Sequence, residues 1–153
     1  MGKIEKLAEV FDLKQKHISC VALPPTIDSV MRIQEHLGFK LPQSYILFAQ
    51  QAKHYGNWLA SIGEDYESET HIINLNDEWH GIASPEKRLP SNFVIFNVGY
   101  DEDFDCFDTE TYDENTGEYL ITYWYPGVDL RECGLHESFI ASMQSHILGW
   151  SYT

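Results

Sequence analysis

Phe93-Val94-Ile95-Phe96-Asn97-Val98 is an almost continuous apolar run in the second half of the chain. Strands that are covered on both faces show such runs, because neither side of the strand meets water. We therefore expect residues 93–98 to form a central strand of a buried sheet, with the other elements of the fold arranged around it.

Two further strands are predicted after this run. Residues 104–108 and 119–125 are rich in aromatic and β-branched side chains, which favour strands. Between them, Asp113-Glu114-Asn115-Thr116-Gly117 has the composition of a turn, so the two strands should form a hairpin. On the amino-terminal side of the run, residues 58–62 and 71–73 are predicted as shorter strands, followed by a helical turn up to His80.

The amino-terminal third has the periodicity of helices. Apolar side chains recur at helical spacing on Ile4, Leu7, Ala8 and Phe11. A second helix has an apolar arc of about 160° made by Ile27, Val30, Met31, Ile33 and Leu37. Thr26 is placed to cap this helix at its start, and Gly38 to end it in a left-handed conformation. A third helix is expected to begin with Pro42 at its first position.

A closing helix completes the pattern, with Ser138 as its N-cap. Its apolar arc is made by Leu135, Phe139, Ile140, Met143, Ile147 and Trp150. The order of elements predicts an α+β fold in which amino-terminal helices and a carboxy-terminal helix pack on a largely antiparallel mixed sheet. The length of 153 residues fits a single domain over residues 1–153.

Cysteine usage and hydropathy indicate a cytoplasmic protein. Cys20, Cys106 and Cys133 are odd in number and far apart, which is typical of reduced thiols and not of a disulfide framework. The chain begins without the apolar core of a signal peptide, and no stretch of 18 apolar residues is present to span a bilayer.

The charge is strongly acidic and unevenly distributed. The net charge is −14, and residues 63–118 hold 16 acidic residues against only two basic ones. Nucleic-acid binding needs clustered Lys and Arg, so we do not expect a nucleic acid as partner. An anionic membrane surface repels an acidic chain, so we do not expect membrane binding either. The acidic segment favours a basic protein as partner instead.

The motifs of metal and catalytic sites are missing. The seven histidines lack the close spacing of zinc ligands, so we expect them to be scattered or satisfied within the fold. Asp101, Asp103 and Asp105 resemble the start of a calcium loop, but Cys106 and Tyr112 occupy the positions that need Gly and Glu. We interpret these aspartates as the charges of a solvated strand edge. No nucleophile or phosphate-binding motif occurs, so we predict no catalytic residue, no metal and no cofactor.

The order of several short motifs resembles the SUKH superfamily of SMI/KNR-like domains. Glu35-His36-Leu37-Gly38 followed by Leu41-Pro42-Gln43-Ser44-Tyr45-Ile46-Leu47-Phe48 is similar to its amino-terminal signature, and the similarity extends from Thr26 to Ile147. Further similar pieces are Leu89-Pro90, residues 103–108, Glu118-Tyr119 and Ser138-Phe139. The chain departs from the family pattern at residues 55–57, at Glu102 and at Leu120, which leaves the subfamily open.

The resemblance implies an α+β fold and a non-enzymatic, protein-binding role. Similar bacterial domains are inferred to be immunity proteins that neutralise toxins, often nucleases, and a nuclease has a basic active face that an acidic protein can cover. The alternatives are a regulatory or scaffolding module that binds an endogenous protein, and a protein that binds a small molecule or metal. The oligomeric state stays open.

A contact with a basic partner should use the acidic middle of the chain. Carboxylates there would raise the association rate, and tyrosines among them would anchor the contact. The predicted contact residues are Glu64, Asp65, Tyr66, Glu67, Tyr100, Asp101, Glu102, Asp103, Asp105, Glu110, Tyr112, Asp113 and Glu114.

Overall fold

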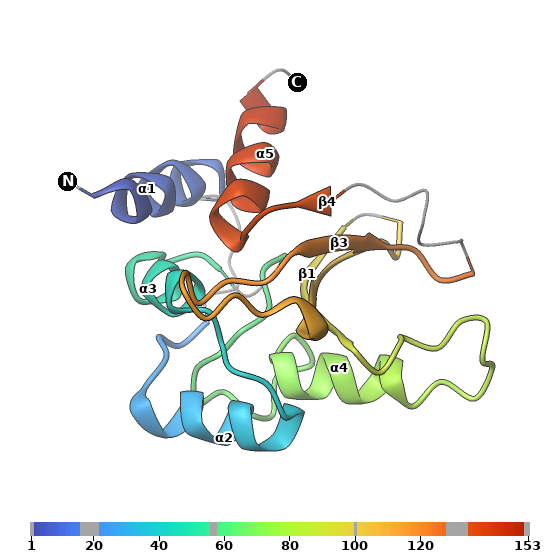
Figure 1. Ribbon diagram of the computed structural model, residues 1–153. Helices are drawn as coiled ribbons and strands as arrows, with labels where there is room; N and C mark the ends of the chain where they lie inside the picture. The colour runs from blue at the N-terminus through green and yellow to red at the C-terminus, as the bar shows by residue number, and fades with distance from the viewer. Residues whose placement is uncertain (1, 16–21, 56–57, 100, 128–134, 152–153) are drawn as a thin grey trace.

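The apolar run forms the first strand of a four-stranded sheet in the computed structural model (Figure 1). The structure describes residues 2–15, 22–55, 58–99, 101–127 and 135–151. The strands are β1 (Phe93–Val98), β2 (Phe104–Asp108), β3 (Ile121–Trp124) and β4 (Leu135–His136). Their order in the sheet is β1-β2-β3-β4, and every neighbouring pair is antiparallel. Together with the helices, this sheet confirms the predicted α+β fold.

The predicted hairpin is confirmed, since β2 and β3 pair along the whole of β3. The connection between them holds a short 3₁₀ helix, η1 (Thr109–Thr111), and then a bridge from Asp113 to Glu118. Gly117 lies inside this bridge at a φ of 71°, in the left-handed region that glycine adopts without steric cost. The turn-forming residues are therefore used where the sequence places them.

Residues 58–60 run beside β1 in an extended conformation. The N–H of Val98 donates to the carbonyl of Trp58 and the N–H of Ala60 donates to the carbonyl of Phe96, each at 2.8 Å. The strand predicted over 58–62 is thus present only as a short stretch of isolated bridges. It hydrogen-bonds Phe96 and Val98 on the outer side of β1.

The prediction of a strand over residues 71–73 is wrong, because helix α4 (Ile72–His80) begins there. His71 is its N-cap, and the Nδ1 atom of His71 accepts a hydrogen bond from the N–H of Ile73 at 3.2 Å. Two consecutive isoleucines favour a strand by local propensity. Ile72, the first residue of α4, is fully buried, so tertiary packing overrides that weak preference.

Three helices precede α4, all where the sequence predicts them. They are α1 (Lys3–Gln15), α2 (Ile27–Leu37) and α3 (Gln43–Gln51). Both predicted caps of α2 are confirmed, since Thr26 accepts from the N–H of Ser29 at 3.0 Å and Gly38 has a φ of 71°. Pro42 is the N-cap of α3 and not its first helical residue, so that prediction is wrong by one position.

The closing helix is α5 (Phe139–Ser151). Ser138 accepts a hydrogen bond from the N–H of Ala141 at 3.1 Å, as expected of the predicted N-cap. Phe139 and Met143 are buried, while the side chains of Leu135, Ile147 and Trp150 lie outside the described residues. None of the helices in the described ranges combines the length and apolar composition of a bilayer span.

Helices cover both faces of the sheet (Figure 1). α3 and α5 lie on one face with α1 packed against both of them, and α4 lies on the other face with α2 outside it. An aromatic core fills the first layer, where the rings of Tyr45 and Phe139 are 4.8 Å apart and Phe96 stacks on Phe107 at 4.3 Å. Under α4, the ring of Trp79 lies 5.7 Å from that of Trp124. β2 is consequently buried on both sides.

Candidate protein-binding surface

The acidic residues that the sequence groups into one contact lie at three separate places. Residues 64–67 belong to the loop before α4, residues 101–103 precede β2, and residues 110–114 follow it. A strand of five residues at about 3.3 Å per residue places roughly 16 Å between its two ends. The turn at 101–103 and the segment at 110–114 therefore lie at opposite ends of the sheet.

The turn at 101–103 is organised by the carboxylate of Asp103. One of its oxygens accepts the N–H of Asp101 at 3.0 Å, and the other accepts the hydroxyl of Tyr123. Glu102 has a φ of 55°, which is unusual for a residue other than glycine. Asp101 and Glu102 are exposed, but Asp103 is committed to the turn, and Tyr100 lies outside the described residues.

Asp105 is buried, so the interpretation of this segment as a solvated strand edge is wrong. β2 lies between β1 and β3, and helices cover both of its faces. Only 4% of Asp105 is exposed, and its carboxylate accepts a hydrogen bond from the Nδ2 of Asn97 at 3.0 Å. Asp105 cannot reach a partner from this position, and we leave it out of the candidate surface.

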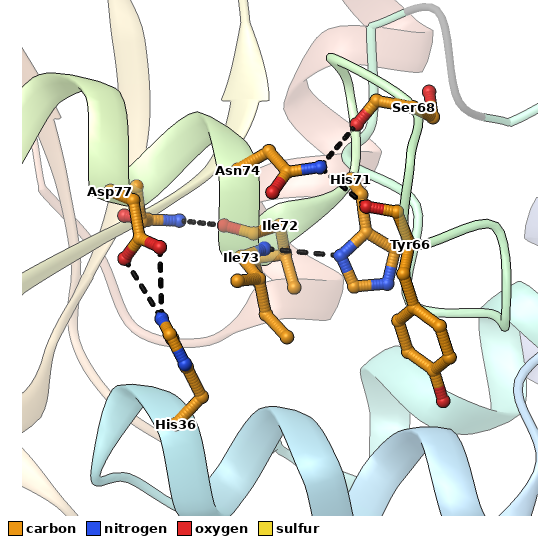
Figure 2. Close-up of polar contacts among 9 residues, drawn as sticks. His36, Tyr66, Ser68, His71, Ile72, Ile73, Asn74 and Asp77 are labelled. Atoms are coloured by element: carbon orange, nitrogen blue, oxygen red, sulfur yellow. Dashed lines mark hydrogen bonds and ion pairs between the residues drawn. The ribbon is translucent and has the colours of Figure 1, made fainter.

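The loop at 63–70 is held by the start of α4 (Figure 2). His71 is fully buried, and its Nε2 donates to the carbonyl of Gly63 at 2.9 Å while its Nδ1 accepts from Ile73. This pattern requires the neutral ring with its proton on Nε2. Burial lowers the pKa of His71, which keeps the ring in that form.

A second α4 side chain fixes the same loop. The Nδ2 of Asn74 donates to the carbonyl of Tyr66 at 2.6 Å and to that of Ser68 at 2.9 Å (Figure 2). Asp65 accepts a hydrogen bond from the hydroxyl of Ser61. The loop backbone is thus rigidly supported, and it presents the exposed side chains of Glu64 and Glu67 to solvent.

Helix α2 packs against this loop. The guanidinium of Arg32 lies 3.8 Å above the ring of Tyr66, and the hydroxyl of Thr26 donates to Glu64 at 3.3 Å. At the other end, the Nε2 of His36 lies 3.0 and 2.9 Å from the two carboxylate oxygens of Asp77 on α4 (Figure 2). α2 and the loop therefore present one continuous surface.

Part of the apolar arc of α2 faces outward. Ile33 is fully buried and Val30 is partly buried, but 81% of Ile27 and 62% of Met31 are exposed. Helical periodicity correctly marks these residues as apolar. It carries no information on how much of an arc the neighbouring elements cover, so the sequence does not predict the exposure of Ile27 and Met31.

A groove of about 550 Å³ lies at the C-terminal end of α2. Tyr119 links two sides of this groove. Its hydroxyl donates to the carbonyl of Lys40 at 2.6 Å and accepts the N–H of the same residue at 3.1 Å. The ring of Tyr112 lies 5.0 Å from that of Tyr119. Residues lining the groove include Gln34, Gly38, Lys40, Tyr112 and Glu114.

These contacts define the candidate surface, which we call the α2 surface. It comprises the outer face of α2 together with residues 64–67 at one end and 110–114 at the other. Eleven residues at about 1.5 Å each make α2 roughly 16 Å long, so α2 joins two of the three acidic places. The third place, at 101–103, lies apart from it.

Four of the seven histidines engage protein atoms. The Nδ1 of His54 lies 3.4 Å from the Oδ1 of Asp12, and the Nε2 of His80 lies 2.9 Å from the carbonyl oxygen of Phe93. His36 and His71 are engaged as described above. Within the described ranges, no group of three or more His, Cys, Asp or Glu side chains is placed to hold a metal ion.

Comparison with known proteins gives a family and a fold. The family model described as SMI1/KNR4 family (SUKH-1) matches residues 24–143, a range that contains the whole α2 surface. The structure is similar to the crystal structure of a protein from Pseudomonas syringae pv. tomato, with a TM-score of 0.65. The two chains are 15% identical, and the match covers 92% of this chain and 95% of that one, which shows a common fold. None of the curated proteins matches the chain.

Proposed function

The chain belongs to the SMI1/KNR4 family (SUKH-1), and from this membership we propose that it is an immunity protein that neutralises a basic toxin domain by covering it. Domains of this family interact with proteins and are of the immunity type, in agreement with the resemblance described from the sequence. A basic toxin, such as a nuclease that must attract a polyanion, is the partner that the charge of this chain favours.

The exposed carboxylates support this proposal. Glu64, Glu67, Glu110, Asp113 and Glu114 are all exposed, and none of them forms an ion pair with another described residue. Unpaired carboxylates on a rigid surface attract a basic protein over a long range and raise its association rate. The observation that carries the proposal is the exposure of these groups, with Glu64 bonded to Thr26 at the start of α2 and Glu114 in the groove at its end.

Two side chains with the chemistry of nucleophiles or bases, Cys106 and His71, are withdrawn from solvent, which supports binding and not catalysis. Cys106 is fully buried in β2, and burial raises the pKa of its thiol, so the reactive thiolate is disfavoured. His71 is likewise buried and committed to backbone partners. We therefore propose that the protein acts without chemistry of its own.

Co-purification tests this function. The tagged chain is expressed together with the products of adjacent genes, and captured proteins are assayed for toxicity with and without it. We expect a basic protein to be captured and its toxicity to be abolished, with an association rate that falls as salt rises. Capture of an endogenous protein without toxicity would indicate a regulatory module and would contradict the immunity role.

A further inference from the structure

Ile27 and Met31 form an apolar stripe that no described residue covers. They lie one turn apart on the same face of α2, with 81% and 62% of their surfaces exposed. The same face continues through Gln34 to Gly38, seven and eleven positions after Ile27, and so leads into the groove in front of Tyr112. Adjoining exposed apolar side chains that lead into a groove are a candidate site of interaction.

Carboxylates surround the stripe and are available to a partner. Asp28 and Glu35 lie on the outer side of α2, Glu64 lies at its N-terminal end, and Glu114 lines the groove at its C-terminal end. All four side chains are exposed. Among the described residues, none of them has a basic ion-pair partner.

These charges decide which kind of partner fits. In a two-fold dimer the same patch meets itself, and its carboxylates outnumber its two exposed basic side chains, Arg32 and Lys40. Most of the charges that face each other would therefore be alike. An anionic lipid surface is repelled by the net charge of −14. The complementary partner is a protein that presents an apolar segment surrounded by Lys and Arg.

We propose that the partner is held along α2, with an apolar segment lying on Ile27 and Met31 and reaching the groove, while its basic side chains meet Glu64 and Glu114. This inference rests on the proposed function and names the part of the acidic surface that performs it. The turn at 101–103 takes no part, because the length of β2 separates it from the groove.

Hydrogen bonds hold the start of α2 and the adjacent loop in place before the partner arrives. Thr26 and Ser29 form a reciprocal capping box at the start of α2, and the hydroxyl of Ser29 also donates to the carbonyl of Ile62 at 2.8 Å. His71 and Asn74 fix the adjacent loop from the other side. A surface that needs no ordering loses less entropy on binding, so its contacts contribute more fully to affinity.

The first test removes the apolar stripe. In the full chain, Ile27→Ala with Met31→Ala keeps the helix, because alanine is the best helix former. We expect the affinity for the co-purified toxin to fall at least about 30-fold, mainly through faster dissociation. The matched control is Val10→Ala with Leu13→Ala on α1, where Leu13 is 62% exposed like Met31. This control should change the affinity less than about twofold.

The second test compares two of the acidic places with double variants that each remove two negative charges. Glu64→Gln with Glu114→Gln neutralises two carboxylates of the α2 surface, and Asp101→Asn with Glu102→Gln neutralises two exposed carboxylates of the turn. At low salt we expect the first pair to slow association about tenfold and the second pair to leave it nearly unchanged. An equal effect of both pairs, or a larger effect of the turn pair, overturns the assignment.

A peptide probe makes the inference independent of finding the toxin. A synthetic amphipathic peptide of Leu and Lys should shift the NMR amide signals of α2 and of residues 64–67 and 110–114, and Ile27→Ala with Met31→Ala should weaken those shifts. Shifts confined to residues 101–103 overturn the inference. So does a wild-type dimer that this double variant dissociates, since a second copy would then occupy the stripe.

The outcomes for the two proposals differ. One outcome is that the toxin is captured and neutralised while Ile27→Ala with Met31→Ala leaves its affinity unchanged. That result overturns the role of α2 and leaves the immunity function standing. A peptide that binds along α2 as expected, in a protein that protects against no toxin, supports the surface and contradicts the immunity function.

Discussion

The side-chain amide of Asn76 exchanges two hydrogen bonds with the backbone of Ile95. Its Nδ2 donates to the carbonyl of Ile95 at 2.9 Å, and its Oδ1 accepts the N–H of Ile95 at 2.7 Å. The same Nδ2 also donates to the carbonyl of Ile72 at 2.8 Å. A helix side chain thus hydrogen-bonds β1 as a neighbouring strand would, and joins α4 to the sheet.

Replacement of Asn76 should be costly. Asn76→Ala leaves both backbone groups of Ile95 buried without their partners, and each such loss costs about 1–3 kcal/mol. We expect a loss of roughly 2–4 kcal/mol in the free energy of unfolding, measured by urea denaturation. Glu78→Ala, an exposed change on the same helix, should stay within about 0.5 kcal/mol. A loss for Asn76→Ala as small as that of the control would refute the bracing role.

Phe48→Ala should open a cavity at the centre of the helical layer. Phe48 is fully buried, and its ring lies 5.4 Å from that of Phe11 and 5.7 Å from that of Phe139. Loss of such a ring costs about 3–5 kcal/mol through lost transfer energy and an unfilled cavity. Leu47→Ala at the neighbouring, 37% exposed position is the control and should cost much less. Equal losses would show that Phe48 is not a core residue.

Elements with strong local signals were predictable, and elements defined by distant contacts were not. The caps at Thr26 and Gly38 act within one helical turn, so the bounds of α2 follow from its own residues. β1 and β2 likewise occur at the expected residues, because the apolar run of β1 and the aromatic side chains of β2 are local signals. The start of α4 depends on a histidine cap and on packing against the sheet, which no local pattern reveals.

The candidate surface shows the same division. The acidity of the middle third is a property of the sequence, but the spacing of its groups in space is set by the length of β2 and by the position of α2. The alternation around Asp105 predicts an exposed face, and helices on both sides of the sheet bury it. The exposure of Ile27 and Met31 depends on which neighbours α2 has, and the sequence does not specify them.

The buried His71 predicts a loss of stability in mild acid. Its pKa is lowered in the fold chiefly by burial, with Arg32 adding to the effect and Gly63 and Asp65 opposing it. As the pH falls below about 6.5, the unfolded chain therefore binds a proton that the folded chain rejects. The contribution of His71 to the free energy of unfolding is therefore fully present above that pH and decreases below it.

The variant His71→Asn isolates this effect, because asparagine is a good N-cap and does not titrate. Urea unfolding near pH 7.5 and near pH 5.5 should show a smaller acid-induced loss for the variant than for the wild type. Parallel pH dependence in the two proteins would show that His71 does not contribute to acid sensitivity.

Asp103 should matter for folding and its neighbours should not. Asp103→Ala removes the acceptor of the Asp101 N–H and of the Tyr123 hydroxyl, which should cost about 1–3 kcal/mol. Asp101→Ala and Glu102→Ala should each change stability by less than about 1 kcal/mol, as exposed residues do. Thermal melts of the three variants make the comparison, and equal melting temperatures would disprove it.

The pair of indoles beneath α4 gives the protein an optical signature of its own. The rings of Trp79 and Trp124 are 5.7 Å apart and inclined at 82°, so their electronic transitions are close enough to couple. Such a pair produces an exciton couplet in circular dichroism that vanishes when either chromophore moves. Because one indole belongs to a helix and the other to the sheet, this couplet reports the docking of α4 separately from the helical content of the chain.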